Sequence, residues 1–201
     1  MEITKVYFIN LEKRKDRLEH IENVLFNKLN FPKEKVERIE GVIVPNENGS
    51  VGCASSHIKI LNKILREKQE VVLILEDDFD VYDPKLFWDY INEFNLNEWD
   101  LIQVSANLIE YQDSRLERLV KVVESQTTSG YIINIKFVNK LLRCFRESKR
   151  ELINTKDTMW AIDQNWKKLQ KKSKWYCFNP RLGFQINGFS DIENKIVDYK
   201  C

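Results

Sequence analysis

The sequence has almost no excess of charge and no long apolar run. Its 32 Lys and Arg against 31 Asp and Glu give a formal net charge of +1 at pH 7. Such a balance offers no argument for a nucleic-acid or membrane-surface partner. No apolar stretch approaches the roughly 20 residues that cross a bilayer, and the opening MEITKVYFINL reads as a strand without the architecture of a signal peptide. These absences predict a soluble, cytoplasmic type of chain with no transmembrane segment.

Cysteine and histidine are also scarce. Cys53, Cys144, Cys177 and Cys201 are widely spaced without a C-x-x-C pair, and the whole chain has 2 His. A structural zinc site of closely spaced Cys and His ligands is therefore not expected, and reduced, partly buried thiols are the simpler interpretation. Cys53 and His57 stand four positions apart on a predicted helix and could share a metal, but no further Cys or His lies near them in the sequence.

What is present is the composition of a globular α/β protein. The 201 residues are 43% hydrophobic and 31% charged, enough for one sizeable core. Strands are expected at residues 5–10, 36–44, 71–75, 100–105, 119–124 and 130–134. Helices are expected at 18–29, from about 52 to 65, at 84–94, near 136–147 and near 157–171, and the tail 175–195 is expected to be mostly loop. Without an internal repeat or linker, this alternation predicts a single Rossmann-like domain over residues 1–201 with a mostly parallel central sheet.

Three adjacent acids, Glu76, Asp77 and Asp78, directly follow the apolar strand VVLIL. Ligands of open α/β sheets bind beyond the carboxyl ends of strands, and neighbouring carboxylates repel one another unless a positive charge lies among them. Mg²⁺ or Mn²⁺ is typically held by one or two carboxylates and substrate phosphates, so the pattern favours a cation and a nucleoside diphosphate. Strand alternation would place Asp77 opposite the other two acids. The alternative is a solvated loop that, with Asp80 and Asp83, caps the next helix.

Several segments occur in the order seen in one enzyme family. They are FINLEKRKDR (8–17), RIEGV (38–42), GSVGCASSH (49–57), LILEDD (73–78), TSGYIIN (128–134), WAID (160–163) and FSDI (189–192). The sequence therefore resembles glycosyltransferase family 25, which includes lipooligosaccharide and collagen galactosyltransferases, although Ser50 stands where that family often has Glu. The resemblance implies a GT-A fold. It also implies a metal-dependent, inverting transfer of a hexose, galactose or glucose, from a UDP-sugar to a hydroxyl of a glycan or protein.

The resemblance also implies roles for residues at the strand ends. The candidate donor-binding residues are Asn10, Leu11, Arg14, Arg17, Ser56, His57, Glu76, Asp77, Thr128, Gly130, Tyr131, Gln185 and Ser190. Mn²⁺ or Mg²⁺ would be held chiefly by Asp78, with Asp191 as the second ligand. Gly130 is expected to let the backbone approach the ligand. The alternatives are exposed helix charges for the two arginines and a core position for His57.

Asp163 is the candidate general base. On a helix through TMWAIDQNWKKL, positions 160, 163 and 166 share one side, which would place Asp163 between Trp160 and Trp166. Burial against indoles raises the pKa of a carboxyl group, and indole faces suit a sugar. The acceptor-side Asp that the family has near this point supports the assignment. The alternative is that both tryptophans belong to the core and Asp163 lies at its boundary.

Three other function classes stay open. A nucleotidyltransferase or other phosphoryl-transfer enzyme would also need a divalent ion at an acidic strand end, but it would consume a nucleoside triphosphate. A catalytically inactive nucleotide-sugar-binding module would bind the donor without turnover. A plain interaction domain would show no change of melting temperature with nucleotide and metal.

Overall fold

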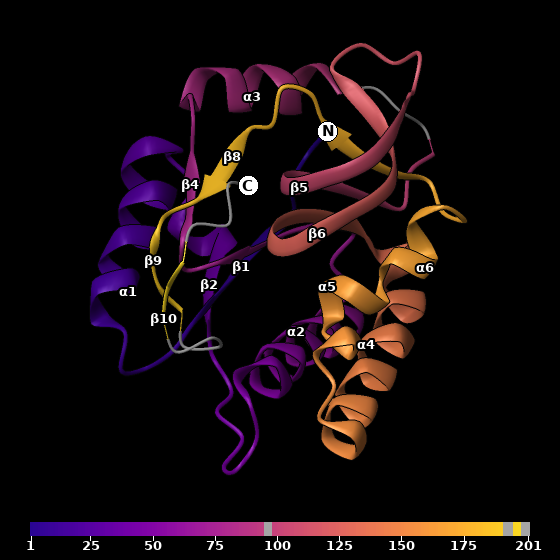
Figure 1. Ribbon diagram of the computed structural model, residues 1–201. Coiled ribbons are helices and arrows are strands. Elements are labelled where there is room, and N and C mark those ends of the chain that lie inside the picture. Colours follow the sequence, from indigo (N-terminus) through magenta and orange to yellow (C-terminus); the bar gives the residue numbers. More distant parts are fainter. Residues whose placement is uncertain (95–97, 191–194, 198–201) are drawn as a thin grey trace.

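A 6-stranded sheet of order β2-β1-β3-β6-β5-β7 forms the centre of the protein (Figure 1). The computed structural model describes residues 1–94, 98–190 and 195–197. The strands are β1 (Lys5–Asn10), β2 (Val36–Glu40), β3 (Val71–Glu76), β5 (Leu101–Asp113), β6 (Leu119–Asn134) and β7 (Trp175–Phe178). β1 pairs in parallel with β2 and β3, and β5 with β7, whereas β6 is antiparallel to its neighbours. The predicted α/β class with a mostly parallel sheet is confirmed.

Helices cover both faces of this sheet. They are α1 (Lys15–Glu22), α2 (Gly49–Glu67), α3 (Pro84–Glu93) and α4 (Ile135–Thr155), with a π-helical turn η1 (Asn23–Lys28) and a 3₁₀ turn η2 (Lys33–Lys35). Figure 1 shows α3 above the sheet and α2 beside α4 below it. Among the described residues, no helix is long and apolar enough to cross a membrane.

Strand β3 shows how the sheet supports apolar layers on both faces. Its central side chains, Val72, Leu73, Ile74 and Leu75, are fully buried. Val72 and Ile74 belong to a core shared with α2 and α4, whereas Leu73 and Leu75 belong to a second core shared with α1 and α3. Because side chains alternate along a strand, a continuous apolar run fills two cores at once. The double burial that the run VVLIL predicts is confirmed.

Side-chain caps decide where two of the helices begin. Asp83 accepts hydrogen bonds from two backbone amides of the first turn of α3, at 2.8 and 3.2 Å, and Pro84 opens the helix as predicted. Asn48 caps α2 in the same way. This helix therefore begins at Gly49, earlier than the expected start near residue 52. The earlier start brings the first turn of α2 up to the loop that follows β2.

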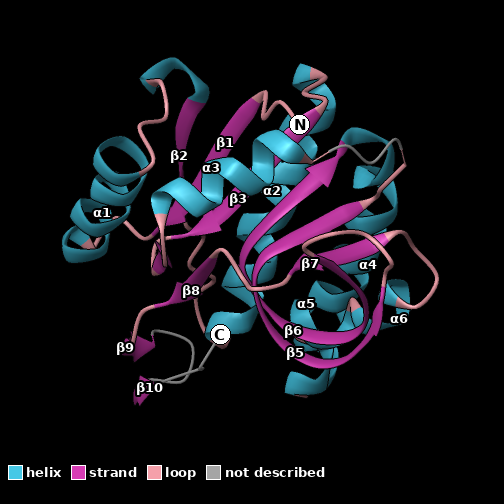
Figure 2. Ribbon diagram, turned by 90° about the horizontal axis from the view of Figure 1, so that it is seen from above, coloured by secondary structure: helices cyan, strands magenta, loops and turns pink. Residues whose placement is uncertain are grey.

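The hairpin of β5 and β6 is longer than expected. β6 is continuous from Leu119 to Asn134, whereas the sequence suggested separate strands at 119–124 and 130–134. Its middle, SQTTS, is polar, so pairing with β5 rather than an apolar pattern makes this part a strand. Figure 2 shows these two strands of the sheet curving side by side. The curve brings residues 126–128 to the cavity described below.

Two expectations for the C-terminal third are wrong. The expected helix at 157–171 is divided into η3 (Thr158–Trp160), α5 (Ile162–Asn165) and α6 (Lys167–Gln170). Ala161, between η3 and α5, has a ψ of 147°, outside the helical region. The tail is not mostly loop, since β7 joins the central sheet. Further strands are β4 (Phe79–Val81), which pairs with β8 (Gly183–Gln185), and β9 (Gly188–Ser190), which pairs with β10 (Lys195–Val197). Such short strands have too few residues to show a pattern of their own.

Phe79 anchors the chain directly after the three adjacent acids. Its ring is fully buried and lies against two glycines from distant strands. A Cβ on Gly183 would lie 2.3 Å from the Phe79 ring and 2.6 Å from the backbone oxygen of Asp80, and a Cβ on Gly130 would lie 2.8 Å from Val104 and 3.0 Å from Phe79. Glycine at these two positions therefore makes room for the ring. The packing fixes the course of the chain from β3 into β4.

Gly183→Ala is expected to destabilise the protein by roughly 1–3 kcal/mol, because the added methyl group overpacks a site bounded by an aromatic ring and backbone. Urea denaturation measures the effect as a lower midpoint at unchanged m-value. Gly188→Ala is the matched control, since a Cβ there has its nearest neighbour at 3.6 Å. Equal midpoints for the two variants would show that Phe79 does not restrict the backbone of β8.

Candidate functional site

The carboxyl ends of β1 and β3 border a cavity of about 880 Å³. Parts of the loop 41–48, the first turns of α2, residues 126–128 of β6, the segment 158–164 and residues 185–186 complete its wall. Glu76, Asp77 and Asp78, here called the acidic turn, all line this cavity. Strand ends of this kind are where open α/β sheets bind ligands. The cavity is therefore the candidate site.

Arg17 of α1 lies against two members of the acidic turn. Its Nη1 is 3.1 Å from Oδ1 of Asp77 and 2.6 Å from Oδ2 of Asp78. Because β3 ends at Glu76 and the chain turns there, strand alternation does not extend to the next two residues. The expectation that Asp77 points away from Asp78 is therefore wrong, and one guanidinium contacts both carboxylates.

The two aspartates of the acidic turn are buried rather than solvated, and Glu76 is half-buried. Asp77 and Asp78 are 8% and 5% exposed, and Asp80 is 8% exposed with its carboxylate 2.7 Å from Nζ of Lys28. Of the four aspartates in the proposed solvated loop, Asp83 alone acts as the helix cap. Burial, together with the negative charge of Glu76, raises the pKa of Asp78 to about 7, and Arg17 opposes this shift. Burial also raises the pKa of Asp77.

Polar groups from other segments complete the hydrogen bonding of the acidic turn. Asn10 Nδ2 donates to Oδ2 of Asp77 at 2.8 Å, and Gln185 Nε2 donates to Oδ2 of Asp78 at 3.0 Å. The backbone amide of Ile186 donates to the carbonyl of Asp78 at 2.8 Å. Oδ1 of Asp78 is buried without a hydrogen-bond partner among the described residues. This oxygen is an unused acceptor within the site.

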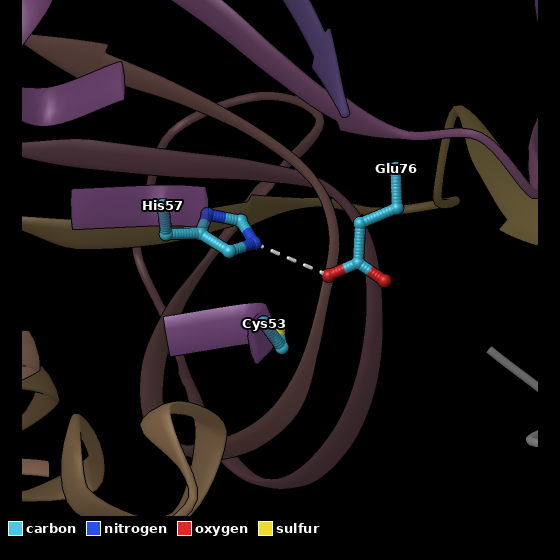
Figure 3. A group of neighbouring side chains, drawn as sticks. All are labelled: Cys53, His57 and Glu76. Atoms are coloured by element: carbon cyan, nitrogen blue, oxygen red, sulfur yellow. Dashed lines mark hydrogen bonds and ion pairs between the residues drawn. The ribbon is translucent and has the colours of Figure 1, made fainter. Parts of the chain in front are cut away.

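His57 holds the remaining acid, Glu76, from the side of α2. The imidazole is fully buried, with Nδ1 at 2.9 Å from the hydroxyl of Tyr131 and Nε2 at 3.3 Å from Oε1 of Glu76 (Figure 3). Thr128 donates its hydroxyl to the same Oε1 at 2.6 Å. Burial acts to raise the pKa of Glu76, but the interactions with His57 and Thr128 outweigh it and the net shift is downward. Glu76 is thus oriented by two side chains from different elements.

Asp163 lines the cavity from the segment after α4. Its Oδ2 accepts hydrogen bonds from the amide of Thr127 at 3.2 Å and from Nε2 of Gln164 at 3.4 Å. Burial, chiefly, and the charge of Glu76 raise the pKa of Asp163, as predicted. Thr127 has a φ of 70°, a conformation that costs a β-branched residue of order 1–3 kcal/mol. Thr127, the strained residue, thus donates the backbone hydrogen bond that orients Asp163.

The two-indole frame expected around Asp163 is not present. Trp166 is fully buried and packs edge-to-face on Tyr131 and Trp175, at centroid distances of 5.9 and 4.9 Å. Ala161 interrupts the expected helix between Trp160 and Asp163, and neither Trp160 nor Trp166 lines the cavity. Trp166 is thus a core residue, and its indole is not available to stack on a sugar in the cavity.

The structure brings most of the predicted site residues to the cavity. Those that line it are Leu11, Arg17, Ser56, His57, Glu76, Asp77, Asp78, Thr128, Asp163 and Gln185. Asp191 lies outside the described residues, as does the side chain of Ser190.

Asn10, Arg14, Gly130 and Tyr131 lie outside this lining. Asn10 donates a hydrogen bond to Asp77 from outside the lining. Arg14 forms an ion pair with Asp16 at 2.7 Å. Tyr131 is fully buried. The expectation that Gly130 admits a ligand does not fit its packing, since a Cβ there would meet Val104 and Phe79.

The loop 41–48 is the part of the site that the sequence did not indicate. Ser56 accepts a hydrogen bond from the amide of Val42 at 2.8 Å and donates to the carbonyl of Gly52 at 2.9 Å. A Cβ on Gly52 would lie 2.3 Å from the carbonyl oxygen of Val42. Small residues four positions apart on a helix are a signal for such close backbone approach. The hydrogen bond to Ser56 and the close approach at Gly52 hold this loop against α2, at the wall of the cavity.

Two solved structures illustrate the fold. Mannose-1-phosphate geranyltransferase from Thermus thermophilus superposes with a TM-score of 0.53 at 10% identity, over 89% of this chain and 74% of its own. A glycosyltransferase involved in the glycosylation of the major capsid of PBCV-1 superposes with a TM-score of 0.51 at 8% identity, over 96% of this chain and 97% of its own. At such identities the likeness concerns the fold alone, which is the GT-A type that the sequence predicted.

Curated proteins share sequence as well. A glycosyltransferase 25 family member of Anopheles gambiae is 27% identical over 172 residues, which are 71% of this chain and 29% of the relative. Procollagen galactosyltransferase 1 of Danio rerio is 30% identical over 108 residues, 49% of this chain and 18% of the relative. The chain thus spans less than a third of the length of these relatives.

The sequence model of one family matches residues 45–165, more than half of the chain. Its description is glycosyltransferase family 25 (LPS biosynthesis protein). The matched region contains His57, the acidic turn and Asp163, all of which line the cavity. The chain belongs to glycosyltransferase family 25.

Proposed function

We propose that this chain transfers a hexose, galactose or glucose, from a UDP-sugar to a hydroxyl group of a glycan or protein, with inversion at the sugar carbon. The observation that carries the proposal is a single cavity that holds the acidic turn with its arginine and a separate, half-buried carboxylate, Asp163. A transferase needs both a donor side and an acceptor side. Relatives named procollagen galactosyltransferase support galactose as the sugar and a hydroxylated protein as one acceptor.

The donor side is proposed at the acidic turn. Lys13 and Arg17 bring positive charge to the cavity lining, and such groups suit a diphosphate. Gln185 lies across the turn and holds Asp78. Glu76, held by His57 and Thr128, is positioned to accept a hydrogen bond from a ribose or sugar hydroxyl.

A divalent cation fits this side of the cavity. The unused oxygen of Asp78 and the carboxylates around it are the donors that Mn²⁺ and Mg²⁺ prefer. Asp78 would hold the ion, and Asp191 is proposed as a second ligand. When bound, the ion would neutralise charge on the leaving diphosphate. Arg17 already offsets part of the charge of the acidic turn, so the ion would have to balance only the remainder.

The acceptor side is proposed at Asp163. For an inverting transfer the base approaches the acceptor hydroxyl opposite the leaving group, so it must differ from the metal-binding acids. Asp163 is separate from the acidic turn and has a raised pKa, which makes its carboxylate a better proton acceptor. Since both of its hydrogen bonds reach Oδ2, Oδ1 is the proposed proton acceptor.

The reaction class is tested by incubating the protein with a panel of nucleotide sugars and Mn²⁺ and measuring release of free nucleoside diphosphate. Release from one UDP-hexose, with a higher Tm in its presence, supports the proposal. Consumption of a nucleoside triphosphate would assign the chain to phosphoryl or nucleotidyl transfer. Binding without turnover, with any acceptor offered, would make it a nucleotide-sugar-binding module.

UDP is expected to bind tightly only with a divalent cation, and Asp78→Asn is expected to abolish this metal dependence together with turnover, because the variant lacks the carboxylate that would hold the ion. Calorimetric titration with UDP, in the presence of the cation and in the presence of a chelator, measures the affinity in each state. Asp80→Asn is the matched control, since Asp80 is equally buried but pairs with Lys28 outside the cavity lining. Equal affinity of the unaltered protein in metal and in chelator would contradict the prediction.

Asp163→Asn is expected to lower turnover by roughly 10²–10⁴, because the amide keeps size and hydrogen bonding but cannot accept the proton. Steady-state rates measure the loss, and calorimetry should show unchanged UDP affinity. The rate of the unaltered enzyme should fall as the pH drops through the raised pKa of Asp163, and this limb should vanish in the variant. Asp157→Asn controls for loss of an acid nearby, since Asp157 caps η3 and Asn is an equally good cap. Normal turnover of Asp163→Asn would pass the role to another acid.

Arg17→Met is expected to destabilise the protein by roughly 3–5 kcal/mol at neutral pH, because it leaves buried carboxylates without their cation. This loss of stability should be smaller at about pH 5 than at about pH 8. Asp78 has a pKa of about 7, so at about pH 5 it is protonated and gains little from the charge of Arg17. Denaturant melts at the two pH values measure both effects. Arg150→Met, which removes an exposed arginine that pairs with Glu151, should cost at most about 1 kcal/mol. Equal losses for the two variants would contradict the role given to Arg17.

A further inference from the structure

Cys53 takes no part in the proposed transfer, yet it lies in the cavity wall beside His57 and Glu76. Cys53 and His57 stand one turn apart on α2, and Glu76 ends β3. Figure 3 shows the imidazole of His57 directed at the carboxylate of Glu76, with Cys53 next to them. A thiol sulfur, a ring nitrogen and a carboxylate oxygen from these residues all lie within 4.8 Å of one another. We propose that Cys53, His57 and Glu76 form a Zn²⁺ site, distinct from the divalent-cation position at Asp78.

The donor set selects the metal. Zn²⁺ is bound by thiolate, imidazole and carboxylate ligands, whereas Mg²⁺ and Mn²⁺ prefer oxygen alone. Three protein ligands with a fourth position left open is the arrangement of accessible zinc sites. All three residues line the cavity, so the fourth position faces it and can hold water or a ligand.

Neighbouring side chains would orient the ligands. Tyr131, at 2.9 Å from Nδ1 of His57, has a hydroxyl that can either donate or accept. With zinc on Nε2, the imidazole proton resides on Nδ1 and is donated to the Tyr131 oxygen, which is the support that metal-bound histidines usually have. Thr128 holds Oε1 of Glu76. Binding would release the thiol proton to solvent and leave the thiolate on the metal.

The site does not depend on transferase activity, because it is defined by the protein and metal alone. The test is titration of the metal-free protein with Co²⁺, a spectroscopic substitute for Zn²⁺, followed by displacement with Zn²⁺. A thiolate-to-cobalt charge-transfer band is expected, and Cys53→Ser should abolish it and weaken Zn²⁺ binding by more than about tenfold. Tyr131→Phe, which removes only the supporting hydroxyl, should weaken Zn²⁺ binding by about 10–100-fold.

Cys144→Ser is the matched control, since Cys144 is a buried thiol on α4 outside the cavity lining. It should keep the band and the affinity of the unaltered protein. Glu76→Gln provides a second ligand variant, and far-UV circular dichroism checks that each variant is folded. The proposal is overturned if the unaltered protein shows no thiolate band, if Cys53→Ser and Glu76→Gln bind Zn²⁺ as tightly as it does, or if excess Mg²⁺ displaces the Co²⁺.

Discussion

The contact of Arg17 with Asp77 and Asp78 is the interaction on which the cavity depends. Carboxylates that are less than a tenth exposed would lose their charge unless a cation compensated them. One guanidinium on α1 contacts both, so the first helix is held against the end of β3 by electrostatics as well as by apolar packing. Asn10 and Gln185 then satisfy further oxygens. The acidic turn can therefore be buried and ordered before any substrate arrives.

Much of the fold followed from local patterns, whereas the irregular parts did not. The run VVLIL predicted a doubly buried strand, and Asp83 with Pro84 predicted the start of α3, because each depends on neighbouring residues only. The middle of β6 and the short strands of the tail depend on partners far away in sequence. Ala161 carries no signal for the break that it makes in the expected helix. Hydrophobic periodicity in a sequence predicts that a helix or strand is present, but it does not indicate where tertiary contacts end it.

The site shows the same division. The position of the three acids after a buried strand predicted that they belong to the site. The directions of their side chains did not follow from strand alternation, because the strand ends at Glu76. Burial raises the pKa of Asp163 as predicted, but Trp166, which was expected to offer an indole face to a sugar, is fully buried in the core. No further Cys or His lies near Cys53 and His57 in the sequence. Glu76, from a neighbouring strand, supplies the third donor.

The pairing of β4 with β8 makes the site sensitive to the order in which the chain is synthesised. Gln185 reaches Asp78 across a separation of 107 residues, and β8 supplies the glycine that accommodates Phe79. During synthesis from the N-terminus, β1, α1 and β3 can assemble long before β8 leaves the ribosome. Until then the nascent chain displays Phe79 and the edge of β4 without their partners. In the interval between translation of Phe79 and of Gln185, this part of the chain is therefore open to misassociation.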